Sequence, residues 1–118
     1  NTPLQALTLL NDQAYVEMAL GFAVSILEKT QGKSDKDRVT HAVRRALSRD
    51  PSAREIKVLL SLLNEQSERL KSDTSIAKSL FSQAPQIEVS EKLDSDEVGA
   101  WFFVANALLN LDETITKG

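Results

Sequence analysis

Apolar residues recur at helical spacing along most of the chain, and the densest example is the segment 94–112, DSDEVGAWFFVANALLNLD. Apolar positions three and four residues apart share one face of an α-helix, and here further apolar residues extend onto other faces. Such a helix needs neighbours on most of its sides. Asp94 can accept hydrogen bonds from the free N–H groups of the first turn, and Glu97 stands three residues later, as in a capping box. The pattern therefore predicts a central helix that begins near Ser95.

Two helices are predicted at the start of the chain. Thr2 and Pro3 open a short leucine-rich helix, because proline is well tolerated at the first helical position. A second helix with a wide apolar face, which includes Met18 and Phe22, is predicted from about residue 13 to 29. It ends at the sequence QGK, residues 31–33, since glycine suits the left-handed conformation that terminates many helices.

Three more segments follow before the central helix. A third helix is predicted to open at Ser34 or Asp35 and to stop before Asp50, since Pro51 disfavours helical geometry in its predecessor. The sequence SARE, residues 52–55, is a capping box that opens a fourth helix, so the third and fourth helices form a hairpin. A shorter helix spans about residues 74–82. The segment 84–93, APQIEVSEKL, contains a proline and mixed charges and is predicted to be a loop.

These segments predict an all-α fold, a compact bundle of five or six helices around the central C-terminal helix. The chain has 118 residues, a length that fits one domain, so residues 1–118 are interpreted as a single all-α domain. The chain does not start with methionine, and we expect it to be a fragment of a longer protein. The family resemblance given below implies the C-terminal fragment of a multidomain protein. The residues predicted to meet in the core are Phe22, Leu60, Leu63, Trp101, Phe102 and Leu108.

Charge and composition narrow the possible functions. The net charge is −3 and the pI about 5.1, without a long run of either sign, which disfavours binding to nucleic acid backbones. Cysteine is absent, which excludes disulfides, thiolate metal sites and covalent c-type haem attachment within these residues. No apolar run reaches the roughly 20 residues that a membrane-spanning helix needs. The sequence therefore indicates neither a nucleic-acid partner nor a membrane span.

Three arginines are the candidate interaction residues. Arg38, Arg45 and Arg49 are spaced along the side of the third helix opposite its apolar stripe, where guanidinium groups could bind a carboxylate, a phosphate or an acidic partner surface. The competing interpretation is an ordinary solvated helix face. His41, the only histidine, lies on the same side and is expected to be a solvated surface residue, because one histidine cannot build a metal site.

Polar residues near the end of the central helix are the candidate structural groups. Asn106 and Asn110 share a face four residues apart, and buried amides must be hydrogen-bonded, so we expect them to tie the helix to a neighbouring backbone or loop. Asp112 and Glu113 oppose the local helix dipole, which indicates an arginine or backbone partner. Adjacent side chains point apart on a helix, which disfavours a metal site there. The chain carries no recognised catalytic, cofactor-binding or metal-binding motif.

Three strings carry a resemblance to a known family. NTPLQALTLLND at residues 1–12, VRRALSRDPSAREI at 43–56 and VANALLNLDETIT at 104–116 resemble a planctomycete-specific domain family of unknown function. That family lies C-terminal to cytochrome-c-like and related domains in large proteins. The match is weakest over residues 71–96, and the chain departs from the pattern at Gln13, where the family often has proline. The resemblance implies an exported protein, periplasmic or in the cell envelope, with haem in upstream domains and no cofactor in this fragment.

Two functional hypotheses remain open. The first is a non-catalytic structural or protein-interaction module that contacts the preceding domains of a larger cytochrome-associated protein. The alternative is a contribution of Asp112, Glu113 or the Arg38 face to an enzyme active site completed by upstream domains. In addition, Leu4, Leu7, Leu9 and Leu10 cover more than one side of a short helix, which predicts a homodimer of the fragment through that helix.

Overall fold

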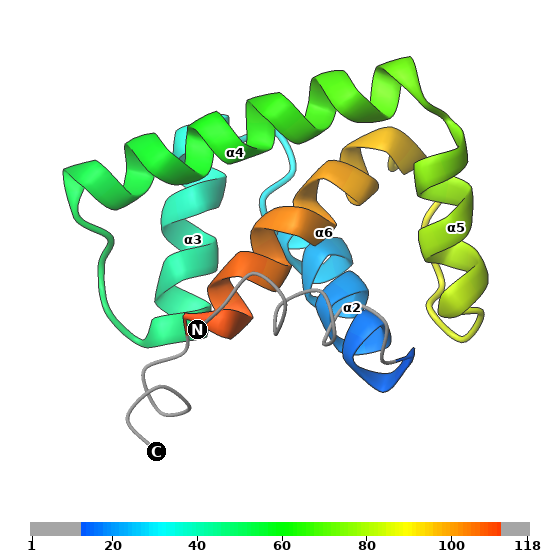
Figure 1. Ribbon diagram of the computed structural model, residues 1–118. Coiled ribbons are helices and arrows are strands. Elements are labelled where there is room, and N and C mark those ends of the chain that lie inside the picture. Colours follow the sequence, from blue (N-terminus) through cyan, green and yellow to red (C-terminus); the bar gives the residue numbers. More distant parts are fainter. Residues whose placement is uncertain (1–12, 112–118) are drawn as a thin grey trace.

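The computed structural model of the protein describes residues 13–111, which form five α-helices without a strand (Figure 1). This confirms the all-α class. The helix predicted over residues 3–10 lies outside the described residues, as do Asp112 and Glu113. The helices are α2 (Gln13–Lys29), α3 (Asp35–Leu47), α4 (Ala53–Ser72), α5 (Ser75–Gln83) and α6 (Ser95–Asn110).

Local signals set the helix ends as predicted at most positions. The side chain of Ser34 accepts a hydrogen bond from the N–H of Asp37 at 3.1 Å and caps α3. Ser52 and Glu55 form the reciprocal capping box of α4. Gly32 takes a positive φ of 78° in the turn after α2, the conformation for which glycine was expected. These contacts fix the α2–α3 and α3–α4 turns, and therefore the hairpins.

The start of α6 departs from the expected capping box. Asp94 caps the helix by accepting from the N–H of Asp96 at 3.4 Å. Glu97 instead directs its carboxylate to Arg38, 3.2 Å away on α3. The tertiary partner is a full cation, so both groups of this hydrogen bond are charged, whereas in a capping box only the carboxylate is. Glu97 therefore joins two helices rather than closing one.

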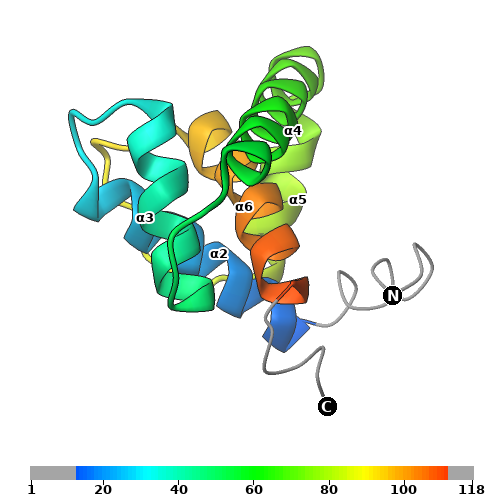
Figure 2. The same ribbon diagram turned by 90° about the vertical axis from the view of Figure 1, so that its left-hand side faces the viewer.

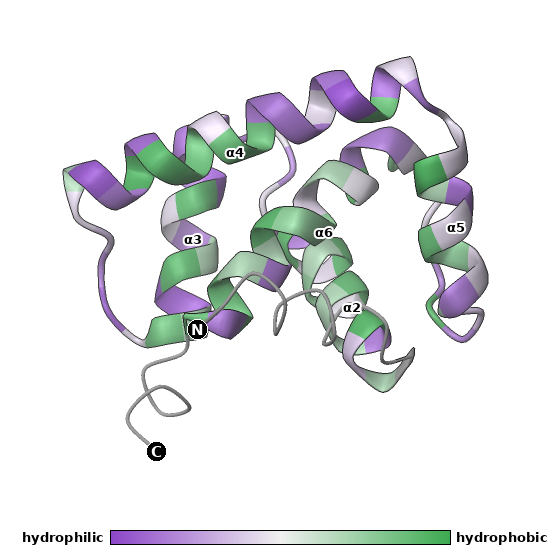
Figure 3. Ribbon diagram, viewed as in Figure 1, coloured by the Kyte–Doolittle hydropathy of each residue, from purple (hydrophilic) through white to green (hydrophobic). Residues whose placement is uncertain are grey.

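Helix α6 is the centre of the bundle. It lies between α4 and α2, with α3 and α5 beside its two ends, and it contacts all four (Figures 1 and 2). Its side chains are buried along most of its length, including Trp101 at 1% and Phe102 at 0% exposure. Figure 3 shows the contrast with α4, which alternates between apolar and hydrophilic residues as a helix with one solvent face does. The predicted central helix is confirmed.

The predicted core is found with two differences in degree. Leu63, Trp101, Phe102 and Leu108 are buried, whereas Phe22 and Leu60 are half-buried and pack against the core from its edge. The segment between α5 and α6 has no regular secondary structure, as predicted, and covers part of α2. No helix within residues 13–111 is long and apolar enough to cross a membrane.

Candidate functional site

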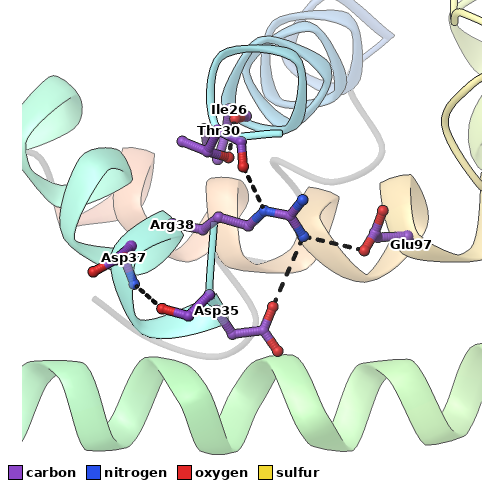
Figure 4. Close-up of polar contacts among 7 residues, drawn as sticks. Ile26, Thr30, Asp35, Asp37, Arg38 and Glu97 are labelled. Carbon is purple, nitrogen blue, oxygen red and sulfur yellow. Dashed lines mark hydrogen bonds and ion pairs between the residues drawn. The ribbon is translucent and has the colours of Figure 1, made fainter. Parts of the chain in front are cut away.

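Arg38 lies inside the bundle rather than on its surface. Its side chain is 13% exposed and joins three helices (Figure 4). The guanidinium donates from Nε to the carbonyl of Thr30 at 3.3 Å and from Nη1 to Oε2 of Glu97 at 3.2 Å. Asp35 is a weaker neighbour at 3.9 Å. The expectation that Arg38 belongs to an outward face is therefore wrong, because α3 packs against α2 and α6 as well as α4.

The position of Thr30 explains why an arginine is suited to the place where α2, α3 and α6 meet. Its carbonyl follows the end of α2, where backbone carbonyls lack partners within the helix. Its hydroxyl donates back to the carbonyl of Ile26 at 2.5 Å. The long aliphatic part of the Arg38 side chain can pack against apolar residues. It places the guanidinium between the carbonyl of Thr30, after the end of α2, and Glu97 in the first turn of α6. The hydrogen bonds of Arg38 therefore hold α2, α3 and α6 together.

Arg49 is used within the α3–α4 hairpin. Its guanidinium donates to both carboxylate oxygens of Glu55, each at 2.8 Å, and also to the carbonyl of Asp50 at 3.2 Å. Glu55 additionally accepts from the N–H of Ser52 at 2.8 Å. The Arg49 guanidinium, followed by the Ser52 N–H, lowers the pKa of Glu55 to about 2. The pair holds the turn closed.

Arg45 is the member of the predicted set that faces outward. Its Nη1 donates to the hydroxyl of Ser25 on α2 at 3.1 Å, and its guanidinium carbon lies 6.0 Å from the ring centre of Phe22. The side chain is exposed, and within residues 13–111 it has no carboxylate partner. The neighbouring Arg44 forms an ion pair with Asp50. The structure therefore does not bring Arg38, Arg45 and Arg49 together into one site.

His41 is half-buried, contrary to the expectation of a solvated residue. Its Nε2 is buried and has no hydrogen-bond partner among the described residues. Burial, followed by the positive charges of Arg45, Lys29 and Arg44, lowers its pKa below the ordinary value of 6.5. The spacing correctly grouped His41 with Arg38 and Arg45 on one side of α3. That side meets α2, which the sequence did not reveal.

The candidate structural amides remain within their own helix. Asn110 donates from Nδ2 to the carbonyl of Asn106 at 2.9 Å, so this amide bonds α6 to itself and not to a neighbouring element. Asn106 is buried, and its Oδ1 has no hydrogen-bond partner among residues 13–111. Asp112, the third candidate, lies outside the described residues. The tie to a neighbouring backbone is thus not seen for Asn110.

Two apolar hollows were missed by sequence reasoning. The first, called here the Arg45 groove, is a cavity of about 450 Å³ between α2, α3 and α6. It is lined by Met18, Gly21, Phe22, Ser25, Arg45, Ala46 and Leu109. The second, of about 170 Å³, lies between α3, α4 and α6 and has Val58 and Leu111 on its rim. Only the unusual width of the apolar face of α2 could have signalled the first.

The large apolar residues that are exposed to solvent line these two hollows. Met18 is 51% exposed, Val58 57% and Leu111 54%. Met18 was assigned to an inward apolar face, so part of that face is not covered by the other helices. Among the described residues, no group of three or more His, Cys, Asp or Glu is arranged to hold a metal ion. The geometry can therefore accept apolar side chains, with a cation beside the larger hollow.

Comparison with known proteins adds a family. Residues 1–63 match the PSD1 family, described as a protein of unknown function (DUF1553). The matched part includes two of the strings singled out above, 1–12 and 43–56, whereas the string 104–116 lies beyond it. Neither a curated protein nor a solved structure was found to match the chain. Because the match spans more than half of the 118 residues, the chain belongs to the PSD1 family of proteins of unknown function.

Proposed function

We propose that this domain is a non-catalytic structural and protein-interaction module of a larger planctomycete protein that also contains cytochrome-c-like domains. The observation that supports the proposal is that two of the three candidate arginines form contacts within the domain. Arg38 joins α2, α3 and α6, and Arg49 closes the α3–α4 hairpin on Glu55. Groups that could bind or activate a substrate are thus engaged in holding the helices together.

The apolar hollows support the interaction role. Exposed apolar side chains that border a hollow offer a surface on which an apolar group of a partner can dock. Met18, Val58 and Leu111 are each more than half exposed and border the two hollows. Preceding domains of the same protein are the proposed partners, since a linked domain meets its neighbour at high effective concentration.

The alternative is a share in an enzyme active site completed by upstream domains. Asp112 and Glu113 lie outside the described residues and neither favour nor oppose it. Arg38 would have to leave both the carbonyl of Thr30 and the carboxylate of Glu97 to meet a substrate. That cost favours the structural role. From the resemblance of residues 1–12, 43–56 and 104–116 to the planctomycete family, we further propose an exported protein with haem in its upstream domains.

Association with the upstream part of the protein tests the proposal. The 118-residue chain and the separately produced upstream portion should bind each other in calorimetry at micromolar concentration. The upstream portion alone should keep its haem absorption spectrum, since the chain supplies no haem ligand in the proposal. Failure of the two folded parts to associate would contradict the interaction role. Loss of the haem spectrum on removing the chain would favour the alternative.

The homodimer predicted from Leu4, Leu7, Leu9 and Leu10 concerns residues outside the described range, and it belongs to the same proposal. The isolated chain should dimerise, because those leucines would otherwise face solvent. Light scattering on the isolated chain measures the mass directly. A chain extended upstream should lose the dimer, since the preceding domain then takes its place, and a monomer at high concentration would refute the idea.

A further inference from the structure

We propose that the Arg45 groove binds an acidic, apolar-faced segment of a partner protein, whose apolar side chains enter the groove while a carboxylate pairs with Arg45. This inference rests on the proposed interaction role and assigns it a place and a chemistry. The groove is lined by residues of α2, α3 and α6. It is an open depression of about 450 Å³.

The floor of the groove suits an apolar side chain. Gly21 contributes no side chain there, while Phe22, Ala46 and Leu109 supply apolar lining. Met18 stands on the rim at 51% exposure. Methionine is flexible and polarizable, so it can adapt to an incoming side chain better than a branched residue can. An apolar residue of a partner helix would be desolvated at this place.

The Arg45 side chain is positioned beside this apolar lining by contacts with Ser25 and Phe22. The hydroxyl of Ser25 accepts one of its N–H groups at 3.1 Å, and the ring of Phe22 lies 6.0 Å below the cation. A guanidinium has five N–H donors, so most of its capacity remains after the bond to Ser25. By contrast, Arg38, Arg44 and Arg49 each have a carboxylate partner within the described part of the chain. Arg45 is thus the arginine of α3 positioned to receive a carboxylate from outside.

The surrounding charge favours an acidic partner. Lys29 and Arg44 lie near His41 on the same side of the molecule as Arg45, close enough to act on its titration. Arg44 is already paired with Asp50, whereas Arg45 has no carboxylate partner within residues 13–111. Complementary charge speeds association and excludes wrong partners. A nucleic acid fits less well, because phosphate binding draws on many cations, whereas this groove offers one arginine over an apolar floor.

A peptide probe tests the inference on the full chain. The probe is a fluorescein-labelled helical peptide built from repeated Leu-Glu-Glu-Leu blocks, with a matched peptide in which lysine replaces every glutamate. Fluorescence anisotropy should show saturable binding of the acidic peptide and at least tenfold weaker binding of the basic one. Arg45→Ala and Met18→Glu should each weaken the acidic peptide at least tenfold. Arg54→Ala, an exposed arginine at the other hollow, should leave binding within twofold.

The remaining outcomes separate this inference from the proposed function. Equal binding of both peptides, or no effect of Arg45→Ala, overturns the assignment of the groove. If Arg45→Ala dissociates a dimer in sedimentation velocity, the occupant is a second copy of the chain and the proposed partner is wrong. If the variant still binds the upstream domains normally but the wild type ignores the peptide, the interaction role stands and this inference fails. Circular dichroism melts establish that each variant remains folded.

Discussion

The guanidinium of Arg38 on α3 donates to the carboxylate of Glu97 in the first turn of α6 across 3.2 Å, and it also donates to the carbonyl of Thr30. One side chain therefore joins the end of α2 to the start of α6, although Arg38 and Glu97 are 59 residues apart in sequence. The negative charge of Glu97 also lies at the positive end of the α6 dipole. The joint orients the central helix relative to the α2–α3 hairpin.

Removal of the two partners should have unequal effects. Arg38→Ala leaves the Glu97 carboxylate without its donor and the Thr30 carbonyl with only the N–H of Lys33, 3.0 Å away, and should lower the free energy of unfolding by about 1.5–3 kcal/mol, as for hydrogen bonds to charged groups. Glu97→Gln should cost only about 0–1 kcal/mol, because its side chain is 41% exposed and water screens the charge. Urea denaturation measures both. Arg44→Ala, at an exposed pair, is the control, and an equal or larger loss there would contradict the assignment.

His41 should report its environment directly. Burial, together with the positive charges of Arg45, Lys29 and Arg44, holds its pKa below 6.5 in the folded chain. It is the only histidine, so a proton NMR titration follows one Hε1 signal without ambiguity. We expect a midpoint below pH 6.5 in native protein and near 6.5 in urea. A native midpoint at or above that value would mean that Nε2 has a partner or meets solvent.

The same shift has a consequence for stability. As the pH falls below 6.5, the unfolded chain takes up a proton on His41 before the folded chain does, so the free energy of unfolding decreases. His41→Gln removes this proton uptake. Between pH 7 and pH 5 the unfolding free energy of the variant should therefore fall less steeply than that of the wild type. Parallel curves for the two proteins would contradict this.

The contribution of Glu55 to stability should change with pH at lower pH values than that of His41. Its pKa of about 2 in the folded chain lies below the ordinary value of 4.5, because Arg49 and then Ser52 stabilise the carboxylate. The stabilising contribution is present above pH 4.5 and is lost as the pH falls from there towards 2. The stability difference between wild type and Glu55→Gln should thus shrink across that window. Glu91→Gln, in the exposed loop before α6, is the matched control for the substitution itself.

Much of the fold followed from local sequence signals. The bounds of α2, the opening of α3 at Ser34 or Asp35, the capping box at Ser52 and the burial of Trp101 were all predicted. Each depends on residues close in sequence or on a strong apolar period. The first helix was predicted as well, but it lies outside the described residues and stays a prediction.

The functional side chains were harder to place because their environments depend on tertiary packing. The spacing of Arg38, His41 and Arg45 showed that they share one side of α3 but not that this side meets α2. The partners of Arg38 come from two other helices, and no local pattern encodes such a meeting. The Arg45 groove is likewise a product of three helices, and only the excess width of the apolar face of α2 hinted at it.

Gly99 should be more important than its position in a helix suggests. Glycine lowers helix stability, so replacement by alanine normally gains up to about 1 kcal/mol. Here a methyl group on Gly99 would lie 3.1 and 3.2 Å from the two methyl carbons of Leu70 on α4. Leu70 is fully buried and has little room to move. We expect Gly99→Ala to destabilise the protein by about 1–3 kcal/mol, the usual cost of overpacking.

Two further variants decide whether close packing is the cause. Gly21→Ala on α2 is the matched control, since its methyl group would lie at an ordinary 3.5 Å from Ile87, and it should be neutral or stabilising. Leu70→Val makes room, so Gly99→Ala should cost less in that background than in the wild type. Thermal and urea melts of the wild type, the three single variants and the double variant give these differences. If Gly99→Ala were as stabilising as Gly21→Ala, the tight contact between α4 and α6 would not be real, because helix propensity alone would then account for both variants.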